Sequence, residues 1–335
     1  LRRTRGQNPM TVGRLRLRLI TTAIVALLAA PQCSSSSCAA ELAVEHATQI
    51  EQIISSLMKT HGVPGLSIAV GKDNELVYAS GFGEADLENS VPATADTRYR
   101  TASIAKPMTA AIVLALAEEN RLDLDKDVRQ YVPEFSRKRW PVTSRQLLGH
   151  LGGVRHYRTS AESSSTAHYF TLKSALATFA DDPLIHQPGT KYRYSSFSYN
   201  LLGSVAEGAS GKTFPELLRT RVLSPASMTH TAVDDQYAVI PDRSRGYIRA
   251  TVNLLKQLPT DHNLVEGQLY NATLHDTSMK IPGGGLLSTA PDLVRFANAV
   301  NSVGLHITLP PPGKKRDHSS SRPAPGAGAG AGNSW

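Results

Sequence analysis

Apolar positions along the chain follow a helical period first and a strand pattern next. Apolar side chains recur one helical turn apart between residues 41 and 60, and this spacing predicts an amphipathic helix. Residues 66–70 and 75–80 are two short runs rich in strand-forming side chains, separated by the turn-forming sequence of residues 71–74. The two runs therefore predict an antiparallel β-hairpin.

Three later segments also carry the helical pattern, at residues 110–119, 199–209 and 291–302. The last of these follows Ser288 and Thr289, either of which is a suitable N-cap. The chain shows no alternation of parallel strands with helices and no internal repeat. These patterns predict an α+β fold, in which helices flank an antiparallel sheet and a mainly helical subdomain is attached to it.

The first 40 residues differ in composition from the rest of the chain. After Met10 the chain is basic, then apolar over residues 19–30, and then rich in small side chains. This order is typical of a secretory signal peptide, with residues 1–9 as an upstream extension. We expect a cleaved leader and a periplasmic or secreted protein. The alternative is an uncleaved membrane anchor or a lipoprotein attached through Cys33, although the apolar run is too short to span a bilayer unaided.

The last part of the chain is low-complexity sequence. Residues 304–335 combine a proline run, a serine run and alternating alanine and glycine. Such composition cannot form a packed core, so we expect a disordered tail, either natural or produced by a shifted reading frame. The folded domain is therefore expected to occupy residues 41–303.

Charge and cysteine content exclude several classes of function. The formal net charge is +8, but the basic excess lies in the two terminal segments and leaves residues 41–308 close to neutral. A neutral body gives no electrostatic case for nucleic acid as a partner. Both cysteines, Cys33 and Cys38, lie in the leader, so the body has neither disulfide nor thiolate chemistry. The histidines lack the spacing of metal ligands, and we expect neither metal nor cofactor.

The chemistry centres on Ser103 and Lys106, which are three positions apart and so share one face of a helix. Pro107 is tolerated only in the first helical turn, which places the helix start close to Ser103. Free N–H groups and the helix dipole favour negative charge there. This geometry indicates a nucleophilic serine with a lysine as its proton acceptor. The alternative is a capping serine beside a solvated amine.

Four further segments accompany this pair, which itself lies in Tyr99–Lys106. They are His61–Gly65, Leu147–Val154, Pro188–Ser196 and Gly284–Thr289. Together with the pair they resemble the serine β-lactamase and penicillin-binding-protein superfamily, in the class C-like branch that includes mitochondrial β-lactamase-like hydrolases. The resemblance covers about residues 45–303 and implies a β-lactamase/transpeptidase-like fold.

The resemblance implies roles for particular residues. Ser103 would attack an acyl carbon, and Lys106 would take its proton if its pKa is lowered. Tyr194 matches the first residue of the family's Tyr-x-Asn element and would share proton transfer with the leaving group. Ser196 stands where the family has asparagine, a substrate-binding position, and this departure is typical of members that are not lactamases. An alternative register would instead use Asn200.

The resemblance also implies a third element, Lys-Thr-Gly or His-x-Gly, on a strand near the C-terminus. Residues 211–213 match it in part, but they end a helix too early and Phe214 replaces the glycine. Nothing after residue 303 fits. We therefore expect a chain that lacks the C-terminal strands of the fold, through truncation or a frameshift.

The expected function is that of an exported serine hydrolase that forms an acyl-enzyme on Ser103. Its substrate would be an ester or amide, such as a D-amino-acid peptide, an ester or a β-lactam-like compound. The alternative is a catalytically impaired remnant that at most binds muropeptide-like ligands. A small molecule or a peptide is the expected partner, contact with a membrane is expected only through an uncleaved leader, and the sequence gives no oligomeric state.

Overall fold

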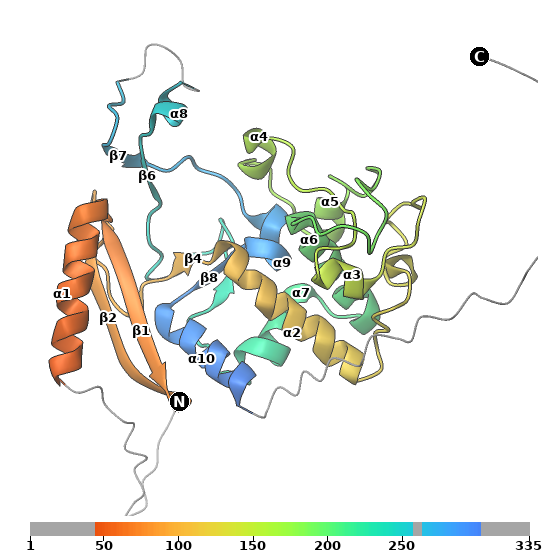
Figure 1. The fold of residues 1–335 in the computed structure, drawn as a ribbon, viewed down its shortest axis with the longest axis horizontal. Helices are drawn as coiled ribbons and strands as arrows, with labels where there is room; N and C mark the ends of the chain where they lie inside the picture. The colour runs from red at the N-terminus through yellow and green to blue at the C-terminus, as the bar shows by residue number, and fades with distance from the viewer. Residues whose placement is uncertain (1–43, 257–262, 303–335) are drawn as a thin grey trace, which may run out of the picture. The chain divides into compact units, whose positions relative to one another are not determined.

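The computed structural model describes residues 44–256 and 263–302 (Figure 1). The expectations for the leader and for residues 304–335 lie outside these ranges. The predicted hairpin is present as β1 (Gly65–Lys72) and β2 (Glu75–Asp86), which pair antiparallel. Its turn residues Asp73 and Asn74 have φ values of 52° and 65°. A two-residue hairpin turn requires this left-handed conformation, which Asp and Asn tolerate better than most residues.

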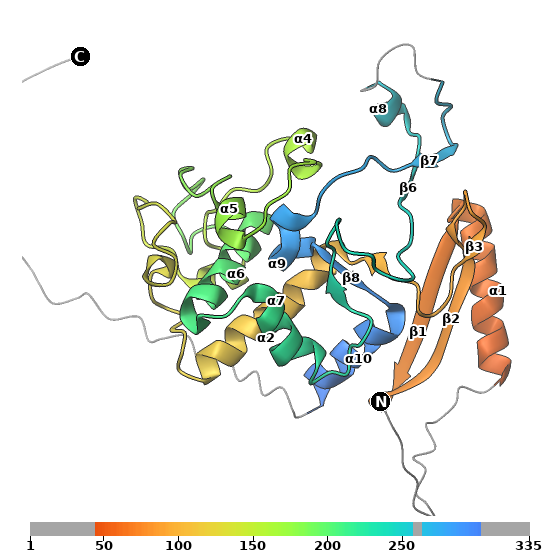
Figure 2. The ribbon, with the colours of Figure 1, turned by 180° about the vertical axis from the view of Figure 1, so that it is seen from behind.

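Two helices flank the hairpin, which also pairs with the short strand β3 (Val91–Pro92) in the order β1-β2-β3. The predicted first helix is α1 (Val44–His61), which contacts β2, and the predicted last helix is α10 (Ala290–Asn301), which packs on both long strands. Figures 1 and 2 show both helices running beside the hairpin. The hydroxyl of Thr289 accepts the N–H of Asp292 at 3.2 Å, so Thr289 is the residue that caps α10.

Helix α1 buries little of its apolar face. Ile53 and Leu57 are 58% and 48% exposed, although both belong to the apolar pattern that predicts the helix. In the part of the chain that the structure describes, no helix combines the length and the apolar character needed to cross a membrane.

A second small sheet leads into the candidate site. It contains β4 (Tyr99–Arg100), β8 (Leu286–Ser288) and β5 (Ala232–Val233) in the order β4-β8-β5. Tyr99 pairs with Ser288, so residues almost two hundred positions apart are neighbours. A third pair consists of β6 (Tyr247–Arg249) and β7 (Leu269–Asn271). None of these short strands carries a pattern long enough to be predicted.

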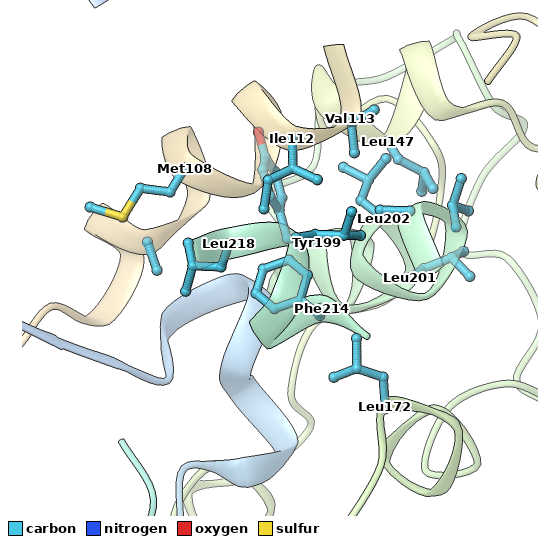
Figure 3. Close-up of a cluster of buried hydrophobic side chains, with 14 of the residues drawn as sticks. Met108, Ile112, Val113, Leu147, Leu172, Tyr199, Leu201, Leu202, Phe214 and Leu218 are labelled. Atoms are coloured by element: carbon cyan, nitrogen blue, oxygen red, sulfur yellow. The ribbon is translucent and has the colours of Figure 1, made fainter. Parts of the chain in front are cut away.

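The helical body is built around α2 (Ala105–Glu118) and α6 (Ser196–Ser210), which pack on each other. Their facing side chains form the main core, together with residues from the loops between them (Figure 3). Shorter helical segments surround the pair. They are η1 (Ala102–Ile104), η2 (Val128–Gln130), α3 (Ser144–Leu148), α4 (Ser160–Ser163), α5 (Leu172–Leu176), α7 (Phe214–Leu218), η3 (Arg219–Leu223), α8 (Val252–Leu255), η4 (Ser278–Lys280) and α9 (Ile281–Gly284).

Close packing at α6 depends on a missing side chain. A Cβ at Gly208 would lie 1.9 Å from the carbonyl oxygen of Tyr131. Only glycine therefore allows the loop that contains Tyr131 to lie against this helix. The helix then ends at Gly211, which adopts the left-handed conformation with φ 68° that is typical of a helix C-terminus. These contacts fix α6, whose first residues belong to the candidate site.

Candidate active site

Ser103 lies between the small sheet and the helical body. After β4, the N–H and hydroxyl of Thr101 both donate to the carbonyl of Leu286, at 2.9 and 3.1 Å. Ala102 then turns the chain with a φ of 45°, an unfavourable left-handed conformation for a residue that has a Cβ. Ser103 follows in η1, directly before α2, and its side chain is exposed. Pro107 lies in the first turn of α2, where the sequence places it.

Lys106 points into the protein and is only 5% exposed. Its amine lies 2.7 Å from the carbonyl oxygen of Gly283, 3.0 Å from Ser103 Oγ and 3.3 Å from Ser196 Oγ. Burial lowers the pKa of the Lys106 amine, although a hydrogen bond and the charge of Tyr194 oppose the shift. A lowered pKa is the property that a lysine needs in order to accept a proton from serine.

Tyr194 makes a further contact with the hydroxyl of Ser103. Its hydroxyl lies 2.6 Å from Ser103 Oγ, and the Lys106 amine lies 5.0 Å from the centre of its ring. Burial acts to raise the pKa of the Tyr194 phenol, but hydrogen bonds to Lys106 and Ser103 and the lysine charge outweigh it and lower the pKa. The structure thus brings together all the site residues that the sequence predicts, including Ser196.

Ser196 is the first residue of α6 and is 7% exposed. Its hydroxyl interacts with Lys106 and with the phenol of Tyr157, whose pKa burial raises to about 12. The alternative register is not supported by these contacts. Asn200 lies in the second turn of α6, where its amide donates to the carbonyl of Met279 at 2.6 Å, and no hydrogen bond joins it to Lys106.

Sequence reasoning missed the carbonyl of Gly283 as a partner of Lys106. Residues 283–285 are predicted only as a tight backbone passage near the cleft. The structure agrees with that passage, because a Cβ on Gly284 would lie 3.2 Å from the backbone of Ala102. A main-chain acceptor leaves no side-chain signature in a sequence, so this contact had no signal of its own.

Two histidines beside Tyr194 were also missed as site residues. The ring of His150 lies 4.5 Å from that of Tyr194, and the ring of His156 lies 5.6 Å from it. The sequence gives them a turn or packing role. The available signal was their place on either side of the turn of Gly152 and Gly153, with His150 inside the segment Leu147–Val154 that carries the resemblance and His156 two residues beyond it.

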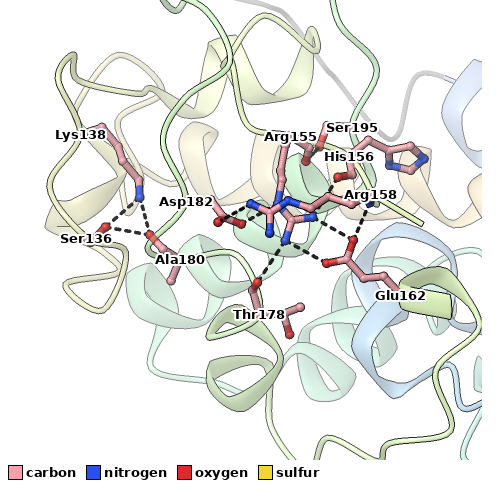
Figure 4. A network of polar contacts seen from close by, with 10 residues as sticks. All are labelled: Ser136, Lys138, Arg155, His156, Arg158, Glu162, Thr178, Ala180, Asp182 and Ser195. Carbon is pink, nitrogen blue, oxygen red and sulfur yellow. Dashed lines mark hydrogen bonds and ion pairs between the residues drawn. The ribbon is translucent and has the colours of Figure 1, made fainter. Parts of the chain in front are cut away.

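An ion-pair network lies next to His156 and Ser195 (Figure 4). Arg155, which is 8% exposed, pairs with Glu162 and Asp182. Arg158 pairs with the second oxygen of Asp182 at 2.7 Å. The Arg155 carbonyl accepts the hydroxyl of Ser195 at 2.6 Å. This network therefore fixes the chain that contacts the start of α6.

The partial Lys-Thr-Gly match has a structural role elsewhere. Gly211 ends α6, Lys212 forms an ion pair with Glu216 at 2.9 Å, and Thr213 caps α7. These contacts occupy a helix junction, as expected from the early position of residues 211–213. The expectation for the segment after residue 303 lies outside the described residues.

Ser103 is hydrogen-bonded to a buried lysine and to a tyrosine, at a helix start beside an antiparallel sheet. These features define the class of proteins with a Ser-x-x-Lys site. The sequence comparison names the family. The model of the Beta-lactamase family matches residues 50–334, and the chain belongs to this family. The family and the fold class that the sequence predicts are therefore confirmed.

Three similar proteins illustrate the match. The mouse serine beta-lactamase-like protein LACTB, mitochondrial, is 29% identical, and the alignment covers 71% of this chain and 54% of the relative. The octameric penicillin-binding protein homologue from Pyrococcus abyssi is 27% identical with a TM-score of 0.62, over 76% of this chain and 56% of that one. EstCE1, a hydrolase with promiscuous acyltransferase activity, shares the fold at 21% identity and a TM-score of 0.62, over 76% and 72%. The chain spans about half the length of the curated relative.

Proposed function

We propose that the chain is a serine hydrolase that forms an acyl-enzyme on Ser103 with an ester or amide substrate. The observation that carries the proposal is the pair of contacts at Ser103 Oγ, to the Lys106 amine at 3.0 Å and to the Tyr194 hydroxyl at 2.6 Å. A nucleophile in contact with a base, which is itself oriented by other groups, is the arrangement that covalent catalysis requires. Membership of a family that includes hydrolases supports it.

The proposed reaction has two stages. Ser103 Oγ forms a bond to the acyl carbon, and its proton passes to the neutral amine of Lys106. The bond to the leaving oxygen or nitrogen then breaks, and Tyr194 gives that atom a proton, which the phenol recovers from Lys106. In the second stage water attacks the acyl carbon, the bond from that carbon to Ser103 Oγ breaks, the same two groups pass a proton of the water to Ser103 Oγ, and the carboxylic acid leaves. The lowered pKa values of Lys106 and Tyr194 suit both steps.

One oxyanion donor is available in the described residues. Ser103 lies at the start of η1, where the first N–H groups of a helix have no intrahelical acceptor. The second donor expected from the family belongs to the third element, for which the sequence after residue 303 has no match. Loss of one donor typically lowers kcat by about 100- to 1,000-fold. A catalytically impaired protein is therefore the competing proposal.

The substrate is proposed as a D-amino-acid peptide, an ester or a β-lactam-like compound. Ser196 in place of asparagine favours the first two, because a hydroxyl lacks the fixed donor and acceptor pair of an amide. Export to the periplasm or medium is also a proposal, supported by the signal-like pattern of residues 1–40. Recovery of a protein with a new N-terminus near residue 40 from outside the cytoplasm would support it, and full-length protein inside the cell would contradict it.

The acyl-enzyme is tested with activity probes. The protein is incubated with a fluorescent fluorophosphonate or a fluorescent penicillin, and labelling is read by gel and by intact mass. We expect labelling that disappears in Ser103→Ala and persists in Ser55→Ala, an exposed serine of α1 that serves as the matched control. If neither probe labels folded wild-type protein, the result would contradict the proposed hydrolase activity and support the impaired alternative.

A further inference from the structure

Two histidine rings accept hydrogen bonds from the backbone at the start of α6. The backbone N–H of Ser195 donates to Nδ1 of His150 at 3.2 Å, and the next N–H, of Ser196, donates to Nδ1 of His156 at 3.1 Å. Between these bonds, the hydroxyl of Ser195 donates to the carbonyl of Arg155 at 2.6 Å (Figure 4). Residues 150–156 thus accept three hydrogens from two consecutive residues, directly after Tyr194.

The same rings also contact Tyr194. The His150 ring is tilted against the tyrosine ring at 4.5 Å between centres, and the His156 ring meets it edge-on at 5.6 Å. The ring of Tyr194 therefore contacts both imidazoles, and the backbone amides of the next two residues donate hydrogen bonds to them. The two rings thus surround the residue whose hydroxyl lies 2.6 Å from Ser103 Oγ.

The hydrogen bonds require neutral histidines. A backbone N–H can donate to Nδ1 only when that atom carries no proton, so both rings must hold their proton on Nε2. Burial lowers the pKa of both rings, and the charge of Lys106 lowers both further. Each neutral ring therefore suits a site that already contains a buried amine.

The groups that face the two rings come from several elements. His150 faces Lys106 of α2, the tyrosines at 192, 194 and 199, and His156. His156 faces Lys106, the tyrosines at 157 and 194, and Glu162 of α4. Glu162 alone acts to raise the pKa of His156, and its two oxygens are already bonded to Arg155.

We propose that His150 and His156 are positioning residues for acylation, which as neutral acceptors hold the amides of Ser195 and Ser196 and so place Tyr194 on Ser103. The inference rests on the proposed function for its activity readout. Protonation of either ring removes an acceptor, leaves a buried N–H facing an N–H, and adds a cation beside Lys106. The loop then loses its register, and the Tyr194 hydroxyl loses its place.

The proposal predicts that the rate of labelling falls at acid pH, and we call this fall the acid limb. Both histidines titrate below the ordinary histidine value of about 6.5, so labelling should fall as the pH drops through that region. The asparagine variants His150→Asn and His156→Asn keep an acceptor oxygen where Nδ1 lies but cannot be protonated. The leucine variants His150→Leu and His156→Leu fill the site without an acceptor. His46→Asn, on the exposed surface of α1, is the matched control.

The second-order rate of fluorophosphonate labelling is measured for each variant between about pH 5 and pH 8, together with melting temperature. We expect each asparagine variant to retain most of the rate near pH 7.5 and to shift or flatten the acid limb, and the leucine variants to lose about 10- to 100-fold. The control should match wild type. An unchanged acid limb in both asparagine variants, or wild-type rates in folded leucine variants, would overturn the proposal.

A measurement without catalysis separates this inference from the proposed function. In protein labelled with ¹⁵N-histidine, NMR reports which ring nitrogen carries the proton. We expect both rings in the Nε2–H form at neutral pH, with Nδ1 unprotonated, also in Ser103→Ala. Protonated Nδ1 on either ring would overturn the inference whatever the labelling shows. Absent labelling with the expected tautomers would instead count against the acyl-enzyme and against the positioning role in it, while leaving the two hydrogen bonds in place.

Discussion

The amine of Lys106 touches three oxygens: the hydroxyl of Ser103 just before its own helix, a hydroxyl of α6 and a carbonyl of α9. An ammonium can donate to all three. A neutral amine has only two hydrogens and a lone pair, so it keeps Gly283 and Ser196 as acceptors and turns its lone pair to Ser103. The geometry therefore serves the protonated and the neutral states without movement of the chain.

Replacement of Lys106 should remove acylation. Lys106→Met deletes the base, and we expect labelling to fall by about 100- to 10,000-fold, the usual contribution of a general base. Lys106→Arg should fall similarly, because guanidinium stays protonated. Intact mass after probe treatment measures both. Acylation at the wild-type rate in the methionine variant would take the lysine out of the mechanism.

Tyr194→Phe should both slow the reaction and move its pH dependence. The phenol acts to raise the pKa of Lys106, so its removal should lower that pKa further and shift the rise in labelling rate to lower pH. Loss of the proton donor should reduce the rate by about 100-fold, the lower end of the range for acid–base groups. Labelling rate against pH measures both effects. A shift to higher pH would contradict the assigned contact.

The residues that sequence reasoning found are those whose side chains form a motif. Ser103, Lys106 and Tyr194 carry recognisable spacing and come together as predicted. The carbonyl of Gly283 and the acceptor atoms of the two histidines could not be found in this way. Every residue has a backbone carbonyl oxygen, and a histidine in a sequence does not indicate from which donor its ring will accept a hydrogen bond.

At the scale of elements, α6 determines the site because its first residues contact Lys106 while its far end packs on the loop at Tyr131. The helix can take this place only because Gly208 has no side chain. Its position is thus set by a close backbone approach at one end and by the hydrogen bonds of Ser195 at the other.

Gly208→Ala tests this constraint. The new methyl group would lie 1.9 Å from a carbonyl oxygen, so the helix or the loop must shift. We expect the free energy of unfolding to fall by about 1–3 kcal/mol, as for overpacked core sites. Gly149→Ala is the matched control, because its Cβ would meet nothing closer than 3.6 Å. Chemical denaturation measures both, and equal stability of the two variants would show that the loop yields freely.

Long elements were predictable, and the shortest strands were not. The helices α1, α2, α6 and α10 and the β1–β2 hairpin follow from periodicity and turn residues over ten or more positions. Strands β4, β5 and β8 contain two or three residues each and form only because distant segments meet. Such strands form through tertiary pairing, and no local sequence pattern predicts them.

At the scale of the molecule, the candidate site closes only when residues 103, 194 and 283 meet. Contacts between such distant positions form late, because the chain must first close long loops. After dilution from denaturant, labelling should therefore recover no faster than the tertiary signal of the helical core, and helical circular dichroism should recover earlier. Labelling that precedes the core would show that the serine and its lysine suffice alone.

The dependence of Lys106 on Gly283 has a meaning for synthesis. A ribosome makes the chain from its N-terminus, so Ser103 and its lysine emerge long before the carbonyl that orients the amine. During that interval the pair lies in water, where the amine keeps its ordinary affinity for a proton and the hydroxyl is a poor nucleophile. The proposed nucleophile therefore gains reactivity only after Gly283 has been made and the residues around the pair have folded.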